Sequence, residues 1–227
     1  MNIISIIPAR GGSTEIPMKN LIKLDNKPLL YYSVTASLNS KYVSKTVVST
    51  DNDKIADYAL SLGAEVVTRP KKISGNRIGI SPAIFHVIDH FKKHENFKPD
   101  VVITLQNTSP FRNSQHIDRA FSIFKKGNYD SVIGGFKSKY LFWQKKGKNV
   151  RPINYNPLKR PNRQEMEKYF IENGAVYVTK YSSLKKFKNY VCGKVGLYVM
   201  PQHLSLEIDS YFDLFLAQQI FKHKKNL

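Results

Sequence analysis

Near its start the chain reads Ile3-Ile4-Ser5-Ile6-Ile7-Pro8, and Ala9-Arg10-Gly11-Gly12-Ser13 follows at once. An apolar run of this kind is typical of a strand that is buried on both faces of a sheet. The paired glycines let backbone N–H groups approach a ligand closely, because no Cβ stands in the way. A buried strand that runs into a glycine loop predicts an α/β fold with a ligand site where the first strand ends.

Short apolar runs alternate with helix-like stretches along the sequence that follows. Further strands are predicted at 45–50, 64–68, 101–106 and 131–136. Amphipathic helices are predicted at 28–39, 53–62, 81–95 and 114–126. This alternation indicates a Rossmann-like, mostly parallel sheet with helices on both faces. Functional side chains are expected in the loops that follow the strands.

The pattern changes between residues 137 and 168, which are polar, basic and interrupted by prolines. We interpret this stretch as an inserted arm, and residues 1–136 and 169–227 as one α/β domain. Core patterning resumes at 173–179 and 195–200, and a final helix is predicted at 211–222.

The composition is that of a globular protein. The 227 residues are 41% hydrophobic and 12% aromatic, which is enough to bury a core and excludes disorder. No apolar run approaches the ~18–20 residues of a membrane span, and no signal peptide is recognisable. The single cysteine, Cys192, excludes an intramolecular disulfide. We expect a cytoplasmic protein with no membrane partner.

The net charge is +19, from 36 basic and 17 acidic residues. Such an excess permits a polyanion partner. However, the basic residues are mostly lysines spread along the whole chain, whereas base recognition favours arginine and duplex-binding modules concentrate charge on one element. We interpret most of the charge as a solvated surface and predict no nucleic-acid partner.

Two cations flank the first glycine loop, Arg10 before it and Lys19 after it. Backbone donors together with flanking positive charge are the combination that binds a polyphosphate. A tight turn with ordinary surface cations remains the alternative. The loop matches neither a P-loop nor a GxGxxG dinucleotide motif.

Amide and hydroxyl side chains follow the strand predicted at 101–106. Gln106, Thr108 and Arg112 together are typical of a ligand rim at the carboxyl end of a strand. Helix capping is the alternative interpretation for this stretch, and it explains only Asn113 or Ser114.

A pair of carboxylates, Glu207 and Asp209, stands late in the chain. In an extended segment both point to the same side, where they repel each other unless a cation lies between them. The pair therefore predicts a Mg²⁺ site. Helix capping is the alternative interpretation here too: Asp209 or Ser210 can begin the final helix, with Asp213 in its first turn.

Taken together, these segments resemble the acylneuraminate cytidylyltransferase family, which includes the CMP-sialic acid synthetases. The resemblance runs from Ile3 to about Ala217, and its motifs occur in the family's order. They are Ile7-Pro8-Ala9-Arg10-Gly11-Gly12-Ser13 with Pro17, Lys19 and Asn20; Ser49-Thr50-Asp51 with Ile55-Ala56; Gly63-Ala64-Glu65-Val66 with Arg69-Pro70; Leu105-Gln106 with Thr108-Ser109-Pro110 and Arg112; Arg163-Gln164; Asn173-Gly174-Ala175-Val176-Tyr177; and Glu207-Ile208-Asp209-Ser210.

The resemblance implies a nucleotide-diphospho-sugar transferase-like fold and a reaction of CTP with a sugar acid. In that reaction the anomeric hydroxyl attacks the α-phosphate in line, assisted by Mg²⁺, and CMP-sugar and pyrophosphate form. The implied nucleotide-binding residues are Arg10, Gly11, Gly12, Ser13, Lys19, Asn20 and Arg69. The implied substrate-binding residues are Gln106, Thr108, Ser109, Arg163 and Asn173. Glu207 and Asp209 would hold the metal, and Lys19, Arg10 and Asp209 would act in catalysis.

The resemblance also implies a homodimer formed through the arm at 137–168. It leaves the sugar open, because a sialic, legionaminic or pseudaminic acid fits the motifs equally. Two alternatives remain: a CMP-Kdo-type synthetase for an eight-carbon acid, and a non-catalytic relative that binds a nucleotide.

Overall fold

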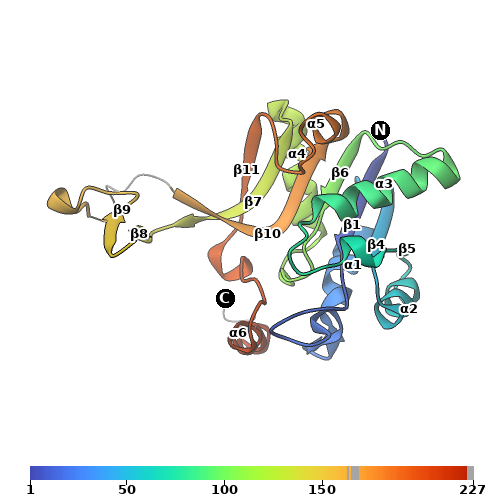
Figure 1. Cartoon of the computed structure of the whole chain (residues 1–227), viewed down its shortest axis with the longest axis horizontal. Helices are drawn as coiled ribbons and strands as arrows, with labels where there is room; N and C mark the ends of the chain where they lie inside the picture. Colours follow the sequence, from blue (N-terminus) through green and yellow to red (C-terminus); the bar gives the residue numbers. More distant parts are fainter. Residues whose placement is uncertain (163, 165–168, 224–227) are drawn as a thin grey trace.

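The computed structural model describes residues 1–162, 164 and 169–223. Its centre is a seven-stranded sheet with the order β11-β7-β10-β6-β1-β4-β5 (Figure 1). The strands are β1 (Ile3–Pro8), β4 (Lys45–Thr50), β5 (Glu65–Thr68), β6 (Val101–Thr104), β7 (Ser131–Ser138), β10 (Tyr169–Lys180) and β11 (Val195–Val199). Neighbouring strands are parallel, except that β10 runs antiparallel to both β6 and β7. The predicted α/β fold with a mostly parallel sheet is confirmed.

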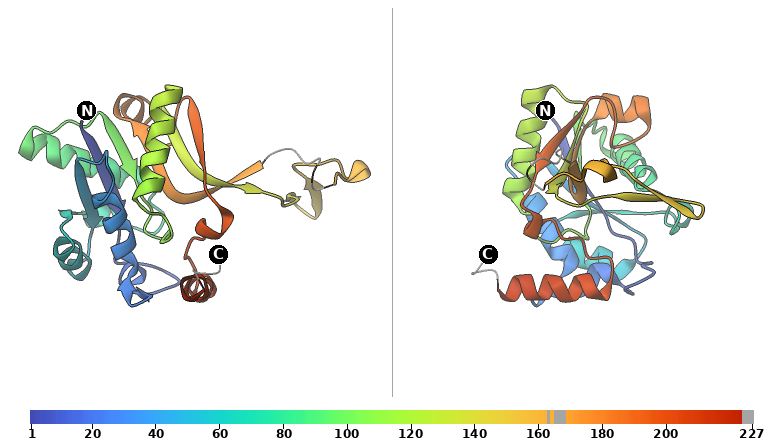
Figure 2. Two further views of the ribbon diagram at one scale, coloured as in Figure 1. Left: turned by 180° about the vertical axis from the view of Figure 1, so that it is seen from behind. Right: turned by 90° about the vertical axis from the view of Figure 1, so that its left-hand side faces the viewer.

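Helices cover both faces of this sheet (Figures 1 and 2). On one face lie α1 (Leu29–Leu38), α2 (Asp53–Ser61) and α4 (Ser114–Gly127); on the other lie α3 (Ser81–Glu95) and α5 (Tyr181–Phe187). Strand β1 shows why its sequence is almost wholly apolar: Ile3 and Ile7 pack into the first core and Ile4 and Ile6 into the second. A strand buried on both faces has no polar side to alternate with.

A smaller third core lies beneath the carboxyl ends of the strands. Helix α6 (Tyr211–Lys222) contributes Leu214 and Ala217 to it, beside the short strands β2 (Lys23–Leu24) and β3 (Lys27–Pro28). Ser210 caps α6, since its side chain accepts a hydrogen bond from the Asp213 N–H while the Asp213 side chain accepts from the Ser210 N–H. The capping interpretation of this stretch is therefore confirmed for Ser210 and Asp213.

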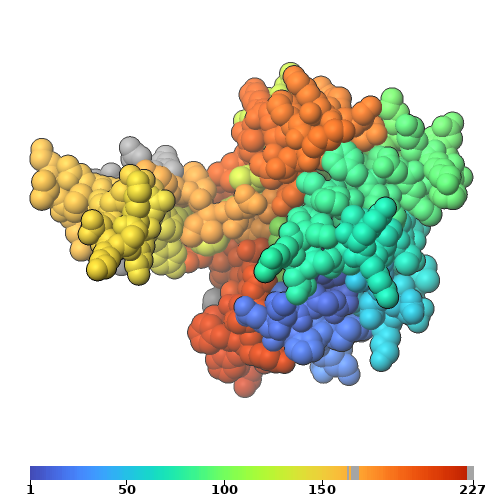
Figure 3. Space-filling model, viewed as in Figure 1, coloured from blue at the N-terminus to red at the C-terminus, as the bar shows by residue number. Residues whose placement is uncertain are grey.

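The described residues 139–162, which follow β7, project from the body of the molecule (Figures 1 and 3). They contain a hairpin of β8 (Trp143–Lys146) and β9 (Asn149–Pro152), followed by the 3-10 helix η3 (Pro157–Lys159). We call the described residues 139–162 the arm.

Strand β10 is longer than the sequence predicts, because it begins at Tyr169 rather than at residue 173. Its first residues alternate between half-buried and exposed and pair with β7 as far as Ser138, so no continuous apolar run marks them. Strand β6 ends at Thr104, two residues before the predicted end. Helix α5 and the β2–β3 pair carry no pattern long enough to predict them.

The strand order also locates the site. Strand β1 lies between β4 and β6, so the chain leaves its carboxyl end toward one side and returns on the other. This is the switch point at which open α/β sheets form a crevice. Within the described ranges, no helix has the length and apolar character that crossing a membrane demands.

Candidate functional site

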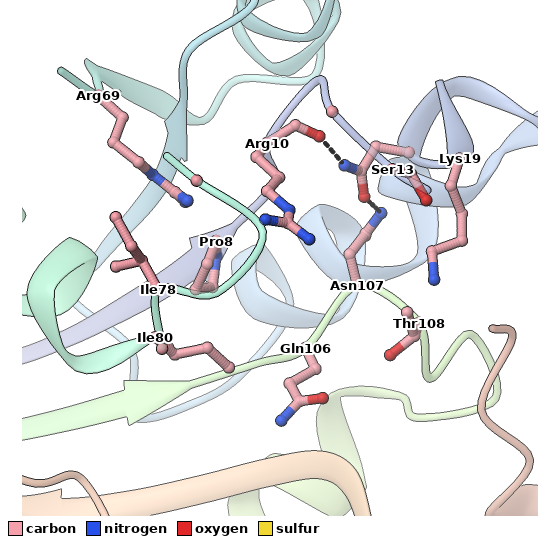
Figure 4. A pocket seen from close by; sticks show the side chains of 14 residues that line it. Pro8, Arg10, Ser13, Lys19, Arg69, Ile78, Ile80, Gln106, Asn107 and Thr108 are labelled. Carbon is pink, nitrogen blue, oxygen red and sulfur yellow. Dashed lines mark hydrogen bonds between the residues drawn. The ribbon is translucent and has the colours of Figure 1, made fainter. Parts of the chain in front are cut away.

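A hollow of about 240 Å³ lies at this crevice, beyond the ends of β1, β5 and β6 (Figure 4). Sites that enclose a whole ligand measure roughly 300–1,000 Å³, so this hollow suits part of a larger ligand. It is lined by Pro8, Arg10, Gly12, Ser13, Lys19, Asn20, Arg69, Gly75, Ile78, Gly79, Ile80, Gln106, Asn107 and Thr108. The structure thus brings together most residues that the sequence suggested for binding.

The loop after β1 is fixed by hydrogen bonds from neighbouring segments. Gly11 donates its N–H to Asp51 Oδ1 at 2.8 Å. Asn20 donates through Nδ2 to the Arg10 carbonyl and accepts through Oδ1 from Asn107 Nδ2, both at 2.7 Å. These hydrogen bonds of Gly11 and Asn20 therefore fix the conformation of the loop, and they hold the Arg10 backbone at the edge of the hollow.

Three cations reach the hollow from different elements, and Figure 4 shows Arg10 between Arg69 and Lys19. Arg69 is buried and donates to the Ser49 carbonyl at 2.8 Å and to Ser49 Oγ at 3.2 Å. Burial lowers the pKa of Arg69; the negative charge of Asp51 opposes this shift, and the nearby Arg10 charge adds to it. Because an anion would relieve the repulsion between the two guanidinium groups, the hollow is suited to phosphate oxygens.

The two loop glycines serve different purposes, and neither has a positive φ. A Cβ on Gly11 would lie 2.9 Å from the Asn52 Cβ, so this glycine permits a close approach between loops. A Cβ on Gly12 would meet no atom within 4 Å, and Gly12 lines the hollow. The absent side chain at Gly12 leaves open space where a ligand can lie.

Three segments join on the opposite side of the hollow. Gln106 donates its N–H to the Gly174 carbonyl at 3.2 Å, and Ile208 donates its N–H to the Thr108 carbonyl at 2.8 Å. Gln106 and Thr108 line the hollow. Two other residues suggested for the substrate do not: Ser109 and Asn173 are buried, and Ser109 Oγ donates to the Asn173 carbonyl.

The Asn173 side chain is occupied inside the protein. Its Nδ2 donates to Ser205 Oγ at 2.9 Å and contacts Met200 Sδ at 3.3 Å, while its Oδ1 accepts the Ala175 N–H at 3.2 Å. These bonds connect β10 to the segment that carries the paired carboxylates. A role of Asn173 in substrate binding stays a prediction.

The carboxylates of Glu207 and Asp209 lie beside this junction. Burial raises the pKa of Glu207 to about 7, and the negative charges of Asp209 and Glu172 add to the shift. Asp209 is exposed and forms an ion pair with Lys19, with 2.8 Å between Nζ and Oδ1. The segment that carries Glu207 and Asp209 therefore has a negative charge that Lys19 compensates only in part.

This donor set fits magnesium. Mg²⁺ prefers carboxylate oxygens and is commonly held by one or two carboxylates together with substrate phosphates. Over residues 1–162, 164 and 169–223, no three acidic, histidine or cysteine side chains gather closely enough to hold a metal unaided. Glu207 and Asp209 would thus supply the protein's share, and phosphate oxygens the rest.

Arg112 does not lie on the rim, and that part of the sequence interpretation is wrong. The side chain is 2% exposed and donates to the carbonyls of Ala175 at 2.9 Å and Gln106 at 3.1 Å, and to Ser33 Oγ at 2.9 Å. Asn113, the next residue, caps α4 by accepting the His116 N–H. Arg112 is an interior strut beneath the site.

Arg163, which the sequence suggests as a substrate ligand, lies outside the described residues. The hollow is also lined by residues that the sequence did not suggest: Pro8, Asn107 and the loop residues Gly75, Ile78, Gly79 and Ile80. A signal for that loop existed: two glycines follow the carboxyl end of β5 and the Arg69-Pro70 motif.

Comparison with known proteins gives a family match over nearly the whole chain. A family model described as "Cytidylyltransferase" matches residues 4–224. N-acylneuraminate cytidylyltransferase A of Danio rerio is 32% identical over 222 residues, which are 96% of this chain and 50% of that protein. N-acylneuraminate cytidylyltransferase of Escherichia coli O18:K1:H7 (strain RS218 / NMEC) is 32% identical over 234 residues, 99% of this chain and 53% of that protein. The chain spans about half the length of these curated relatives.

Solved structures share the fold. CMP:2-keto-3-deoxy-manno-octonic acid synthetase, complexed with CTP, matches with a TM-score of 0.71 and 14% identity, covering 99% of this chain and 100% of that one. The 4-diphosphocytidyl-2C-methyl-D-erythritol synthase of Anaerococcus prevotii matches with a TM-score of 0.69 and 14% identity, covering 97% and 96%. At such identity the likeness concerns the fold alone.

Proposed function

Because the chain belongs to the cytidylyltransferase family, we propose that it transfers the cytidylyl group of CTP to a sugar acid of the acylneuraminate type. The observation that carries this proposal is the convergence of Arg10, Lys19 and Arg69 on one hollow at the end of β1. The carboxylates of Glu207 and Asp209 lie next to it, with Asp209 in contact with Lys19.

In this reaction the chain's own residues position charge. Arg10 and Lys19 would bind the triphosphate and stabilise the negative charge that develops on the departing pyrophosphate. Gln106 and Thr108 would hold the sugar acid so that its anomeric hydroxyl faces the α-phosphorus in line with the leaving oxygen. As the new P–O bond forms, that hydroxyl loses its proton to solvent, and the bond between the α-phosphorus and the pyrophosphate oxygen breaks.

Glu207 and Asp209 would hold Mg²⁺, which when bound neutralises phosphate charge and makes the attacking hydroxyl more acidic. Asp209 lies within ion-pair distance of Lys19, so the two carboxylates would hold that cation close to the phosphates that Lys19 would bind. Arg69, buried against Ser49, would stay fixed at the far side of the hollow.

The direct test measures pyrophosphate release from CTP with Mg²⁺ and a panel of acids: N-acetylneuraminate, diacetyllegionaminate, a pseudaminate and Kdo. ATP, GTP and UTP serve as controls. We expect release with CTP and one nine-carbon acid only, which would name the substrate. Release with Kdo alone would assign the eight-carbon reaction instead. If CTP raises the melting temperature but no acid supports release, the chain is a binding relative without this activity.

Gly12→Ala should weaken CTP binding without changing stability. The added methyl group meets no protein atom but occupies the space of the hollow. We expect the dissociation constant for CTP to rise roughly tenfold or more, the usual order for a methyl group forced into a filled site. Calorimetric titration and thermal unfolding check this. The matched variant Gly11→Ala should lower the melting temperature as well, since its methyl group meets Asn52. Unchanged CTP binding in Gly12→Ala would contradict the placement of the nucleotide.

We also propose that two copies associate through the arm, which lies within the predicted insertion at 137–168. An isolated two-stranded hairpin is at best marginally stable in water. The arm nevertheless exposes large apolar side chains: Tyr140, Trp143, Val150, Ile153 and Leu158 are each about half or more accessible. An exposed apolar patch of this kind normally marks a surface that binds another protein.

Ile153→Asp should therefore dissociate the dimer. Ile153 is 60% exposed, and a carboxylate buried without a partner costs enough to raise the dimer dissociation constant roughly a hundredfold. Sedimentation equilibrium measures it. Leu60→Asp is a matched control, because Leu60 is 56% exposed and belongs to α2, a helix on the opposite side of the molecule from the arm (Figure 1). A wild-type chain that is monomeric at micromolar concentration would refute the association.

A further inference from the structure

A chain of two hydrogen bonds leads away from the hollow. Gln106, which lines it, donates through Nε2 to the Tyr177 hydroxyl oxygen at 3.2 Å. The Tyr177 hydroxyl in turn donates to Glu172 Oε1 at 2.6 Å. The site residue Gln106 is thus connected to an exposed carboxylate by a tyrosine that is 2% accessible.

The Glu172 carboxylate determines which group is the donor in each of the two hydrogen bonds. An ionised carboxylate can only accept, so the Tyr177 hydroxyl must give its single proton to Glu172. The phenol oxygen then has only lone pairs to offer, and it can be satisfied only by the N–H₂ end of the Gln106 amide. The amide of Gln106 is therefore not free to turn around: Nε2 faces Tyr177 and Oε1 faces away.

Tyr177 is suited to transmit this direction. Burial, together with the hydrogen bond to Glu172, raises its pKa, so the hydroxyl keeps its proton. Tyr190 packs edge-on against its ring at 4.9 Å between centroids, which restricts the ring's motion. Tyr177 is consequently a fixed relay and not an acid or base.

The freed oxygen of Gln106 points at a place where another acceptor already lies. A Cβ on Gly174 would be 2.8 Å from Gln106 Oε1 and 2.0 Å from Glu207 Oε1. Both oxygens thus lie where a side chain on residue 174 would begin, so this position needs a glycine, as does its φ of +61°. Among the residues that the structure describes, no hydrogen bond to Gln106 Oε1 occurs. Glu207 is assigned to the metal, so Gln106 Oε1 is the acceptor here that a donor of the ligand can satisfy.

We propose that Glu172 is a positioning residue which, through Tyr177, turns the Gln106 amide so that its oxygen receives a hydroxyl or amide N–H of the sugar acid. The inference rests on the proposed function for the identity of the ligand. It predicts that the site selects acids by a hydrogen-bond donor at this point, and that an acceptor placed there is rejected.

A mutant cycle tests the route. Tyr177→Phe and Glu172→Ala should each raise KM for the best acid of the panel roughly three- to tenfold, the size of one hydrogen bond, while KM for CTP stays within about twofold. Glu172→Gln should have a smaller effect, because its amide oxygen can replace the lost acceptor. The double variant should be no worse than either single one, since both break the same chain. Additive effects would mean that Glu172 acts directly and would overturn the relay.

A matched control separates positioning from packing. Tyr198→Phe removes the hydroxyl of another buried tyrosine, on β11, and should leave both KM values unchanged. Among mono-deoxy analogues of the acid, one should lose affinity for the wild type but not for Tyr177→Phe. If the affinity of every analogue falls by the same factor with both proteins, Gln106 does not accept a hydrogen bond from the sugar acid.

A second readout needs no turnover. With ¹⁵N-labelled glutamine, the side-chain amide signals of Gln106 are identified by their loss in Gln106→Ala. Tyr177→Phe and Glu172→Ala should shift these signals in the free protein, whereas Tyr198→Phe should not. Unmoved Gln106 signals would overturn the inference even in an active enzyme. Shifted signals in a protein that turns over no acid would support the relay and reject the proposed function.

Discussion

Replacing Asp209 by alanine is expected to lower pyrophosphate release from CTP roughly a hundred- to a thousandfold, the usual cost of losing one charged group that acts on the transition state. The physical reason is twofold. The metal would lose one of its two protein ligands, and Lys19 would lose the partner that holds its ammonium group 2.8 Å from Oδ1. Steady-state rates at saturating CTP, acid and Mg²⁺ measure the loss.

The fold should survive this change, since the Asp209 side chain is 69% exposed. Helix α6 keeps its cap, which is made by Ser210 and Asp213. Asp57→Ala, an exposed carboxylate on α2, is the control for loss of a negative charge and should keep full activity. Wild-type turnover in Asp209→Ala would remove this residue from the metal site and from catalysis.

Replacing Arg112 by alanine is expected to lower the free energy of unfolding by about 3–5 kcal/mol. The substitution leaves a cavity where a fully buried side chain stood, and it deprives the Ala175 and Gln106 carbonyls of a donor. Burial lowers the pKa of this guanidinium, yet its acceptors are neutral groups that satisfy it from several directions. Urea denaturation at constant pH measures the change.

Two further variants divide that loss into its parts. Arg112→Met fills most of the volume and should recover part of the stability, while the carbonyls stay unsatisfied. Arg112→Lys keeps the charge but lacks the planar fork, so it should remain destabilised. Arg119→Met, an exposed arginine on α4, should change stability by less than about 1 kcal/mol. Arg112→Ala as stable as the wild type would show that the guanidinium is not needed as an interior strut.

The parallel part of the fold could be predicted from sequence because its strands are continuous apolar runs. Strand β1 is the clearest case, since Ile4 and Ile7 face different cores and both must be apolar. The place of β10 could not be predicted. Its pairing with β6 and β7 joins segments far apart in the chain, and neither periodicity nor composition encodes which neighbours a strand finds.

The candidate site divides in the same way. Arg10, Gly12 and Lys19 belong to one short stretch, so their proximity could be predicted before the fold was known. Arg112 was misjudged because a buried arginine and a rim arginine look identical in sequence, and only the carbonyls around it tell them apart. The Gln106–Tyr177 contact spans 71 positions and leaves no local signal.

The ion pair between Lys19 and Asp209 has a consequence for what the resting site attracts. An anion that binds Lys19 by itself leaves the Asp209 carboxylate without its positive partner. A cation that binds Asp209 by itself likewise leaves the Lys19 ammonium group without its negative partner. A ligand that brings both signs exchanges both partners in one event, at small cost because Asp209 is 69% exposed and an ion pair with a solvated partner is weak. For the proposed reaction, in a protein of net charge +19, we therefore expect a nucleotide that carries its own metal to bind in preference to free phosphate or free metal.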